Sequence, residues 1–225
     1  MSEISSPNFN DRDPKVALEY IVLHYTGMQD AASAVARLCD PSAQVSAHYV
    51  IDEDGSVLQL VDEAKRAWHA GSSFWRGIKD MNSASIGIEL VNPGHEFGYR
   101  LFPSTQTVSL KKLLREILAR HQMSPATALL AHSDIAPSRK QDPGELFPWQ
   151  ALAQEGLGLW PLPQPEDFSV SSEQAFLEEL CSLGYDINSP YEAVLAFQRR
   201  YYPERLTGKT DEQTTARIRA LLRQR

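Results

Sequence analysis

Short apolar runs rich in β-branched residues recur between residues 20 and 132 and constrain the fold more than any other feature. Runs of this length and composition predict buried strands. An Asp-Gly pair at 54–55 separates two of them and predicts a hairpin turn, because glycine tolerates the positive φ that such a turn needs. The five runs are 20–25, 48–51, 56–61, 85–91 and 129–132.

The stretch 105–121 has a different period, which predicts an amphipathic helix lying on a sheet. Its apolar residues recur at intervals of three and four, with lysine and arginine between them: Leu110, Leu113, Leu114, Ile117 and Leu118. Shorter helices are predicted at 31–38, with Asp30 as a candidate N-cap, and at 148–154. This mixture of strands and helices predicts a fold of the α/β class.

A proline-rich segment then marks a candidate domain boundary. Residues 159–165 contain three prolines and cannot continue as a helix or a central strand. We therefore predict a first domain over 1–158, a linker over 159–167 and a small all-α module over 168–225. Three helices are expected in the module, at 172–183, 190–201 and 210–222.

Composition and charge limit the classes of partner. Hydrophobic residues make up 42% and charged residues 23% of the chain, which is typical of a folded globular protein and argues against disorder. The net charge is −7, whereas a nucleic-acid-binding protein needs a clustered basic surface. No stretch approaches the roughly 20 apolar residues of a membrane span, so neither nucleic acid nor a bilayer core is an expected partner.

Three potential metal ligands lie at the ends of predicted elements. His24 ends the first strand, His132 ends a later one, and Asp142 lies ten residues farther on, before Pro-Gly. Two imidazoles and one carboxylate can hold a catalytic zinc with an open position for water. Taken singly, each residue also has a structural interpretation, as a hydrogen-bonded histidine or as a turn-forming aspartate. Spacing alone leaves both interpretations open.

Six segments in a characteristic order resemble the zinc N-acetylmuramoyl-L-alanine amidases that share a fold with phage T7 lysozyme and the peptidoglycan recognition proteins. The resemblance covers about residues 17–155 and is most marked for the bacterial branch that acts on anhydromuramyl or intact muropeptides. It implies a central mixed β-sheet flanked by helices. The segments are Ile21–Thr26, Ser46–Ile51, Arg66–Gly71, Ser85–Asn92, Ala131–Pro137 and Arg139–Gly144.

The resemblance implies a role for each residue of the core pattern. His24, His132 and Asp142 would bind one Zn²⁺ per chain, Glu89 would be the general base, and Lys140 would stabilise the developing oxyanion. Glu89 is the only acidic residue in its apolar strand, where a carboxylate is costly unless it is paired or has a chemical task. The alternatives are a buried ion pair of Glu89 with an arginine, and a solvated surface position for Lys140.

Substrate contacts are predicted in the segment that lines the cleft in this family and in the loop after it. These residues are Trp68, His69, Arg76 and Asn82. Aromatic side chains suit sugar rings and peptide stems, which favours substrate contact for Trp68 and His69, and core packing is the alternative. Loop polarity alone would account for Arg76 and Asn82. His48 is expected to be a core histidine or to support a metal ligand from behind.

The C-terminal stretch 191–211 resembles a small three-helix peptidoglycan-binding module. Wall binding is one interpretation of it, and simple packing on the catalytic domain is the other. The expected reaction is cleavage of the amide bond between N-acetylmuramic acid, or its 1,6-anhydro form, and L-alanine. A non-catalytic recognition protein and an endopeptidase of the stem peptide are the alternatives. The polar start, 1–15, lacks the apolar run of a signal peptide and favours a cytoplasmic location, whereas a wall-binding module would favour the periplasm.

Overall fold

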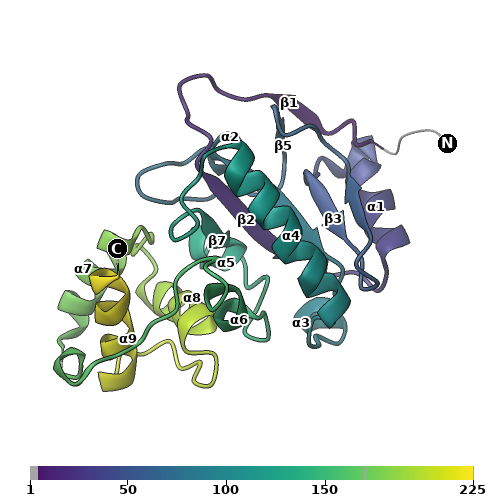
Figure 1. Ribbon diagram of the computed structural model, residues 1–225. Helices are drawn as coiled ribbons and strands as arrows, with labels where there is room; N and C mark the ends of the chain where they lie inside the picture. The colour runs from purple at the N-terminus through teal and green to yellow at the C-terminus, as the bar shows by residue number, and fades with distance from the viewer. Residues whose placement is uncertain (1–4, 170, 225) are drawn as a thin grey trace.

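The computed structural model describes residues 5–169 and 171–224, and its centre is a five-stranded mixed sheet (Figure 1). The strand order is β4-β3-β6-β2-β7, in which β2, β6, β7 and β3 run parallel and only β4 is antiparallel to its neighbour. A separate antiparallel pair joins β1 (Phe9–Asp11) to β5 (Lys65–Ala67). The strands of the main sheet are β2 (Tyr20–Tyr25), β3 (Tyr49–Ile51), β4 (Val57–Gln59), β6 (Ser85–Leu90) and β7 (Leu129–Ala131).

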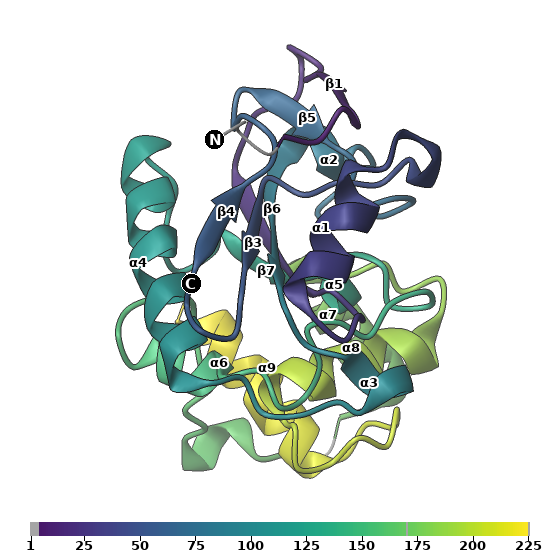
Figure 2. The same ribbon diagram turned by 90° about the vertical axis from the view of Figure 1, so that its right-hand side faces the viewer.

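Helices cover both faces of this sheet. The amphipathic helix α4 (Ser104–Arg120) lies on one face, and α1 (Ala31–Cys39) lies on the other, as Figure 2 shows. Strand alternation directs Ile86, Ile88 and Leu90 toward α4, whose Leu110, Leu113, Leu114, Ile117 and Leu118 share their apolar cluster. The opposite side of β6 is left for Gly87 and Glu89. The α/β fold with a central mixed sheet flanked by helices is therefore confirmed.

Several short helices were not predicted from the sequence, because single helical turns carry too little periodicity to be detected. The predicted hairpin, the five strands, α1, α4 and α6 are all present, and the Asp30 side chain caps α1 by accepting from the Ser33 N–H at 2.7 Å. The short helices that were not predicted are α2 (Met81–Ala84), α3 (Gly94–Phe97) and α5 (His132–Ile135), with 3-10 turns η1 (Pro41–Ala43) and η2 (Pro165–Asp167). The helix predicted at 148–154 is α6 (Trp149–Ala153).

The C-terminal helices α7 (Glu173–Leu183), α8 (Pro190–Tyr201) and α9 (Glu212–Arg223) gather beside β7 and α5 (Figure 1). We call residues 171–224, which contain them, the C-terminal module. Its Phe176, Leu180 and Phe197 belong to the same apolar cluster as Val22 and Leu130 of the sheet. The segment 159–167 thus joins two parts of the sequence that share a continuous core. Within the described residues, no helix has the length and apolar character needed to cross a bilayer.

Candidate metal centre and its cleft

The parallel strands of the sheet bring the candidate site together at their carboxyl ends. His24 lies one residue before the end of β2, and its register partner on β6 is Glu89. His132 follows directly after β7, which is the other neighbour of β2. Ligand sites of open α/β sheets typically lie at this edge, because loops from adjacent parallel strands meet there.

Three side-chain atoms from these loops meet at one point. The Nδ1 atoms of His24 and His132 lie 2.9 Å apart, and each lies 2.9–3.0 Å from Oδ2 of Asp142. All three residues are buried, and they form the one such cluster found within residues 5–169 and 171–224. Two imidazole nitrogens and one carboxylate oxygen are a donor set that zinc prefers, so the residues present fit a metal ion at this point.

The far nitrogens of the two histidines are bonded to the protein, which aims both Nδ1 atoms at Asp142. Nε2 of His132 lies 3.1 Å from the carbonyl oxygen of Ala70, and Nε2 of His24 lies 3.1 Å from Nδ1 of His69. Such outer bonds fix the tautomer and the ring orientation of a metal-ligating histidine. A proton on each Nε2 leaves the Nδ1 lone pair free for a metal.

The charge states of the cluster also suit metal binding. Burial and the neighbouring His132 lower the pKa of His24 to about 4, so that this imidazole is neutral near pH 7. Burial alone would raise the pKa of Asp142, but the imidazoles of His132 and His24 outweigh it and hold that pKa well below its usual range. A neutral imidazole and an ionised carboxylate are the forms that coordinate a cation.

The loop that carries Asp142 is held by Tyr99. The Tyr99 hydroxyl donates to the carbonyl oxygen of Pro143 at 2.7 Å and accepts from the N–H of Leu146 at 3.0 Å. Gly144 lies against the same ring: a Cβ built on it would be 2.2 Å from the Tyr99 hydroxyl oxygen, and its φ of +88° strains any other residue. The loop therefore has little freedom to move Asp142 away from the histidines.

The three candidate ligands form one wall of a cleft of about 430 Å³, which also contains Glu89 and Lys140. Residues of helix α1 and of the loop after β2 also line it. Glu89 is partly exposed to the cleft, yet its Oε2 is buried and has no hydrogen-bond partner among the described residues. Burial and the carboxylate of Asp142 raise the pKa of Glu89 well above its usual value, against the opposing charge of Lys140.

These contacts bear on the interpretations left open for Glu89 and Lys140. No arginine of the described chain pairs with Glu89, so a buried ion pair does not explain its place in the strand. The Lys140 side chain is exposed, as expected of a surface lysine, but it also lines the cleft that contains Glu89. Both residues are placed where a bound molecule would meet them.

His69, predicted to contact substrate, is among the residues that line this cleft, and it bonds to the nitrogen of His24 that faces away from Asp142. It is only 9% exposed, and its Nδ1 faces His24 while its Nε2 lies 3.4 Å from the Ser85 hydroxyl. Its ring packs directly on the backbone of Gly87, where a built Cβ would lie 2.4 Å from His69 Cγ. His69 thus supports the His24 ring, and a glycine inside strand β6 is the sequence signal for this close approach.

The substitution Gly87→Ala is expected to weaken metal affinity roughly tenfold, because the added methyl displaces the ring that orients His24. Titration of zinc against a competing chelator measures the change. In a His69→Ala background the same substitution should have little further effect, since the ring it would strike is absent. An equal loss in both backgrounds would show that Gly87 acts through the strand itself.

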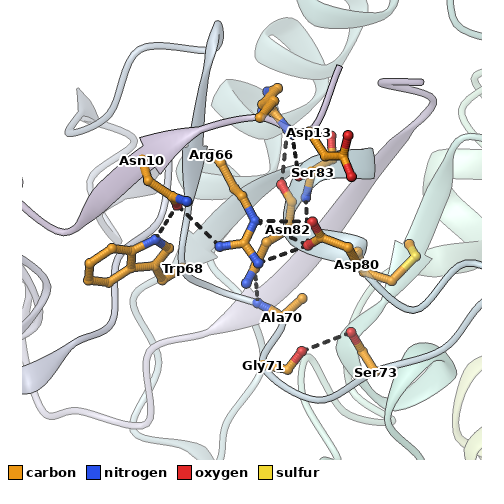
Figure 3. A network of polar contacts seen from close by, with 12 residues as sticks. Asn10, Asp13, Arg66, Trp68, Ala70, Gly71, Ser73, Asp80, Asn82 and Ser83 are labelled. Atoms are coloured by element: carbon orange, nitrogen blue, oxygen red, sulfur yellow. Dashed lines mark hydrogen bonds and ion pairs between the residues drawn. The ribbon is translucent and has the colours of Figure 1, made fainter. Parts of the chain in front are cut away.

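Asn82 and Trp68, two of the predicted substrate contacts, take part in the polar contacts drawn in Figure 3, and of the two only Trp68 lines the cleft. The Asn82 side-chain oxygen accepts from the backbone N–H groups of His69 and Ala70 at 3.0 and 2.7 Å. It therefore fixes the carbonyl of Ala70 that bonds to His132, a role that its loop position did not indicate. The Trp68 indole donates to Asn10 at 2.7 Å, which leaves its half-buried ring facing the cleft.

Arg76, the fourth predicted substrate contact, lies outside this cleft. Its backbone N–H donates to the carbonyl oxygen of Gly184, and its Nε lies 3.3 Å from the carbonyl oxygen of Leu183. Both partners belong to the C-terminal module, more than 100 residues away in sequence. Arg76 therefore lies at the interface with the C-terminal module, which the sequence of its own loop does not indicate.

His48 occupies the core beside this site, as expected. It is fully buried, its Nδ1 accepts from the Gly87 N–H at 2.9 Å, and its Nε2 lies 3.0 Å from the carbonyl oxygen of Lys65. Burial lowers the pKa of this imidazole to about 4. His48 holds the backbone under His69 and does not reach the three candidate ligands.

Comparison with known proteins agrees with this geometry. Residues 13–145 match the family model of N-acetylmuramoyl-L-alanine amidases. The chain is 38% identical to the N-acetylmuramoyl-L-alanine amidase AmiD of Escherichia coli, over 91% of this chain and 82% of that protein. It is 30% identical to the 1,6-anhydro-N-acetylmuramyl-L-alanine amidase AmpD of Haemophilus influenzae, over 66% of this chain and 88% of that one.

Solved structures resemble the whole chain and not only its first domain. The E. coli AmiD complex with anhydro-N-acetylmuramic acid-L-Ala-D-γ-Glu-L-Lys matches with a TM-score of 0.82 at 33% identity, covering 96% of this chain and 98% of that one. AmpDh3 of Pseudomonas aeruginosa in complex with anhydromuramic pentapeptide matches with a TM-score of 0.83 at 30% identity, covering 100% and 99%. The chain belongs to the N-acetylmuramoyl-L-alanine amidase family.

Proposed function

We propose that this chain is a zinc hydrolase that cleaves the amide bond between 1,6-anhydro-N-acetylmuramic acid and L-alanine in peptidoglycan fragments. The observation that carries the proposal is the meeting of His24, His132 and Asp142 in the lining of a cleft to which Glu89 and Lys140 also contribute. The substrate class is supported by AmiD and AmpDh3, whose structures hold anhydromuramyl peptides.

His24, His132 and Asp142 would hold one Zn²⁺ per chain. A zinc ion there would supply Lewis-acid chemistry, polarising the amide carbonyl and making a water molecule more acidic. The bound forms of the three ligands follow from the contacts already described: two neutral imidazoles, each fixed through Nε2, and one carboxylate.

Glu89 would move the proton that hydrolysis requires. As the attacking water forms its bond to the carbonyl carbon, an oxygen of Glu89 takes the water's proton. The same carboxyl then gives that proton to the amide nitrogen as the C–N bond breaks, so that L-alanine leaves as an amine. The raised pKa of Glu89 suits both steps, because it makes the carboxylate a stronger base toward water and so helps it to accept the proton that it later returns.

Lys140 would stabilise negative charge on the carbonyl oxygen as it develops. Two observations support this role: Lys140 lines the same cleft as Glu89, and its charge lowers the pKa of the Glu89 carboxyl. A cation aimed at a developing oxyanion acts mostly on the transition state, so its loss should reduce kcat more than it raises KM.

The substitution Lys140→Met is expected to lower kcat and to move the acid limb of the kcat/KM profile to higher pH. The sign follows from the charge: Lys140 lowers the pKa of Glu89, so without it the carboxylate is lost at a higher pH as the solution is acidified. Lys112→Met, which removes an exposed lysine of α4, is the matched control and should change neither quantity. An unmoved acid limb in Lys140→Met would contradict the proposed coupling.

Mass spectrometry of the products tests the proposed reaction. Purified zinc-loaded protein is incubated with an anhydro-N-acetylmuramyl tripeptide, and the released amino terminus is identified. The proposal predicts a free peptide that begins with L-alanine, together with anhydro-N-acetylmuramic acid. A peptide shortened within the stem would indicate an endopeptidase, and binding without any release would indicate a recognition protein.

A further inference from the structure

The turn that carries His132 is closed by a carboxylate two residues farther along. Asp134 is fully buried, and its Oδ2 accepts from the backbone N–H of Ala131 at 2.8 Å. This bond spans His132 from one side to the other, because it joins the residue before His132 to the residue after Ser133. The direction of the His132 side chain therefore depends on where the Asp134 carboxylate is held.

Two side chains of the C-terminal module hold that carboxylate. The Tyr185 hydroxyl donates to its Oδ1 at 2.6 Å, and Nη1 of Arg200 pairs with its Oδ2. Both partners are buried: Tyr185 is 1% and Arg200 4% exposed. The buried pair of Asp134 and Arg200 need not stabilise the fold, because the cost of desolvating both charges offsets their attraction. We therefore looked for another role of this pair.

Arg200 is itself fixed in position from several sides. Its Nη2 donates to the carbonyl oxygen of Leu129 at 2.9 Å, in the strand that leads directly to His132. Its guanidinium carbon lies 4.2 Å from the ring centre of Trp149 and 4.8 Å from that of Tyr201. One planar cation thus joins the strand before His132 to the carboxylate after it, which a lysine could not do with the same geometry.

The neighbouring arginine of α8 reaches the loop of a second candidate ligand. Nε of Arg199 lies 3.5 Å from the carboxylate of Glu145, three residues after Asp142. Nε2 of His95 lies 3.1 Å from the same carboxylate. Arg199 and Arg200, which are consecutive residues of α8, therefore contact the segments that carry Asp142 and His132.

We propose that the C-terminal module positions the metal centre, with Tyr185 and Arg200 acting through Asp134 to aim the His132 imidazole. The module is then a working part of the catalytic domain, whatever else it binds. The inference rests on the proposed zinc site, since it concerns the affinity of that site. Removing an outer partner of a metal ligand typically costs 10- to 100-fold in affinity.

Two variants test the proposal in the full-length protein. Tyr185→Phe removes one hydroxyl and keeps the packing ring, and Arg200→Lys keeps the charge but loses the double contact. Each is expected to weaken zinc binding roughly tenfold, as measured by competition with a chelator. Tyr185→Phe keeps the test usable should Arg200→Lys fail to fold.

The matched control is Arg223→Met. Nη1 of Arg223, in α9, lies 2.5 Å from the buried carboxylate of Asp167, in η2. This is also an Arg–Asp ion pair, but it touches neither the segment of His132 nor that of Asp142. This variant is expected to lower Tm while its zinc affinity stays within twofold of the wild type. A merely structural role for Tyr185 and Arg200 would give the same pattern as this control, and that result would overturn the proposal.

The wild-type titration separates this proposal from the one on which it rests. Stoichiometric zinc binding by the wild type, with weakened binding by both variants, supports the positioning role. Wild-type binding that both variants reproduce within twofold overturns the positioning role and leaves the zinc site intact. No zinc binding by the wild type overturns the zinc site and the positioning role together.

Discussion

Replacing Glu89 by glutamine is expected to reduce turnover by about 10²- to 10⁴-fold while one zinc per chain stays bound. Glutamine has nearly the same shape but cannot take a proton from water or return it to the leaving nitrogen. Because Oε2 of Glu89 has no hydrogen-bond partner in the described part of the chain, the substitution breaks no contact there. It also removes a carboxylate whose ionisation burial opposes, so Tm is expected to hold or rise.

Three measurements on this variant check the argument: kcat on an anhydromuramyl peptide, zinc content and Tm. Glu116→Gln, at a half-exposed position on α4, is the control and should leave all three near wild-type values. Near-normal turnover in Glu89→Gln would show that another group moves the proton. Lost zinc would show instead that Glu89 takes part in metal binding.

Replacing His24 by alanine is expected to abolish both zinc binding and activity. The substitution removes one of three ligands and also leaves Nδ1 of His69 without its partner. Zinc that binds only the folded state stabilises the folded protein. Removing the zinc with a chelator should therefore lower the Tm of the wild type but not that of the variant.

His121→Ala is the matched control for this loss. His121 lies at the end of α4, where it pairs with Glu63 at 2.6 Å on another part of the surface. This variant should keep one zinc per chain and the same response of Tm to the chelator. If His24→Ala retained stoichiometric zinc, the three-residue site would be wrong.

The sequence predicts most of the sheet and the large helix α4, because both show in the spacing of apolar residues along the chain. Strand 85–91 alternates so that Ile86, Ile88 and Leu90 face α4, while Gly87 and Glu89 face the site, and the structure has this arrangement. Parallel pairing of β2 with β6 then places His24 beside Glu89, because the two residues are register partners. The identity of the family follows from six short segments, and matching residues 13–145 confirms it.

The direction in which a side chain points is harder to predict than its presence in a segment. Trp68 and His69 are adjacent and both line the cleft, yet the Trp68 indole bonds to Asn10 whereas the His69 ring bonds to His24 over the backbone of Gly87. Sequence position alone treats the two residues alike.

Contacts between distant segments are the other feature that the sequence conceals. Asp134 is bonded to Tyr185 and Arg200, which lie 51 and 66 residues away. A turn former is the simplest local interpretation of such an aspartate. Arg76 shows the same limit, because its partners lie in the C-terminal module.

A crystal structure with anomalous scattering measured at the zinc edge tests the central claim most directly. The account predicts one peak per chain, within about 2.0–2.2 Å of Nδ1 of His24, Nδ1 of His132 and an oxygen of Asp142. A zinc peak held by other residues, or a zinc-saturated crystal with no peak between these three, would contradict it.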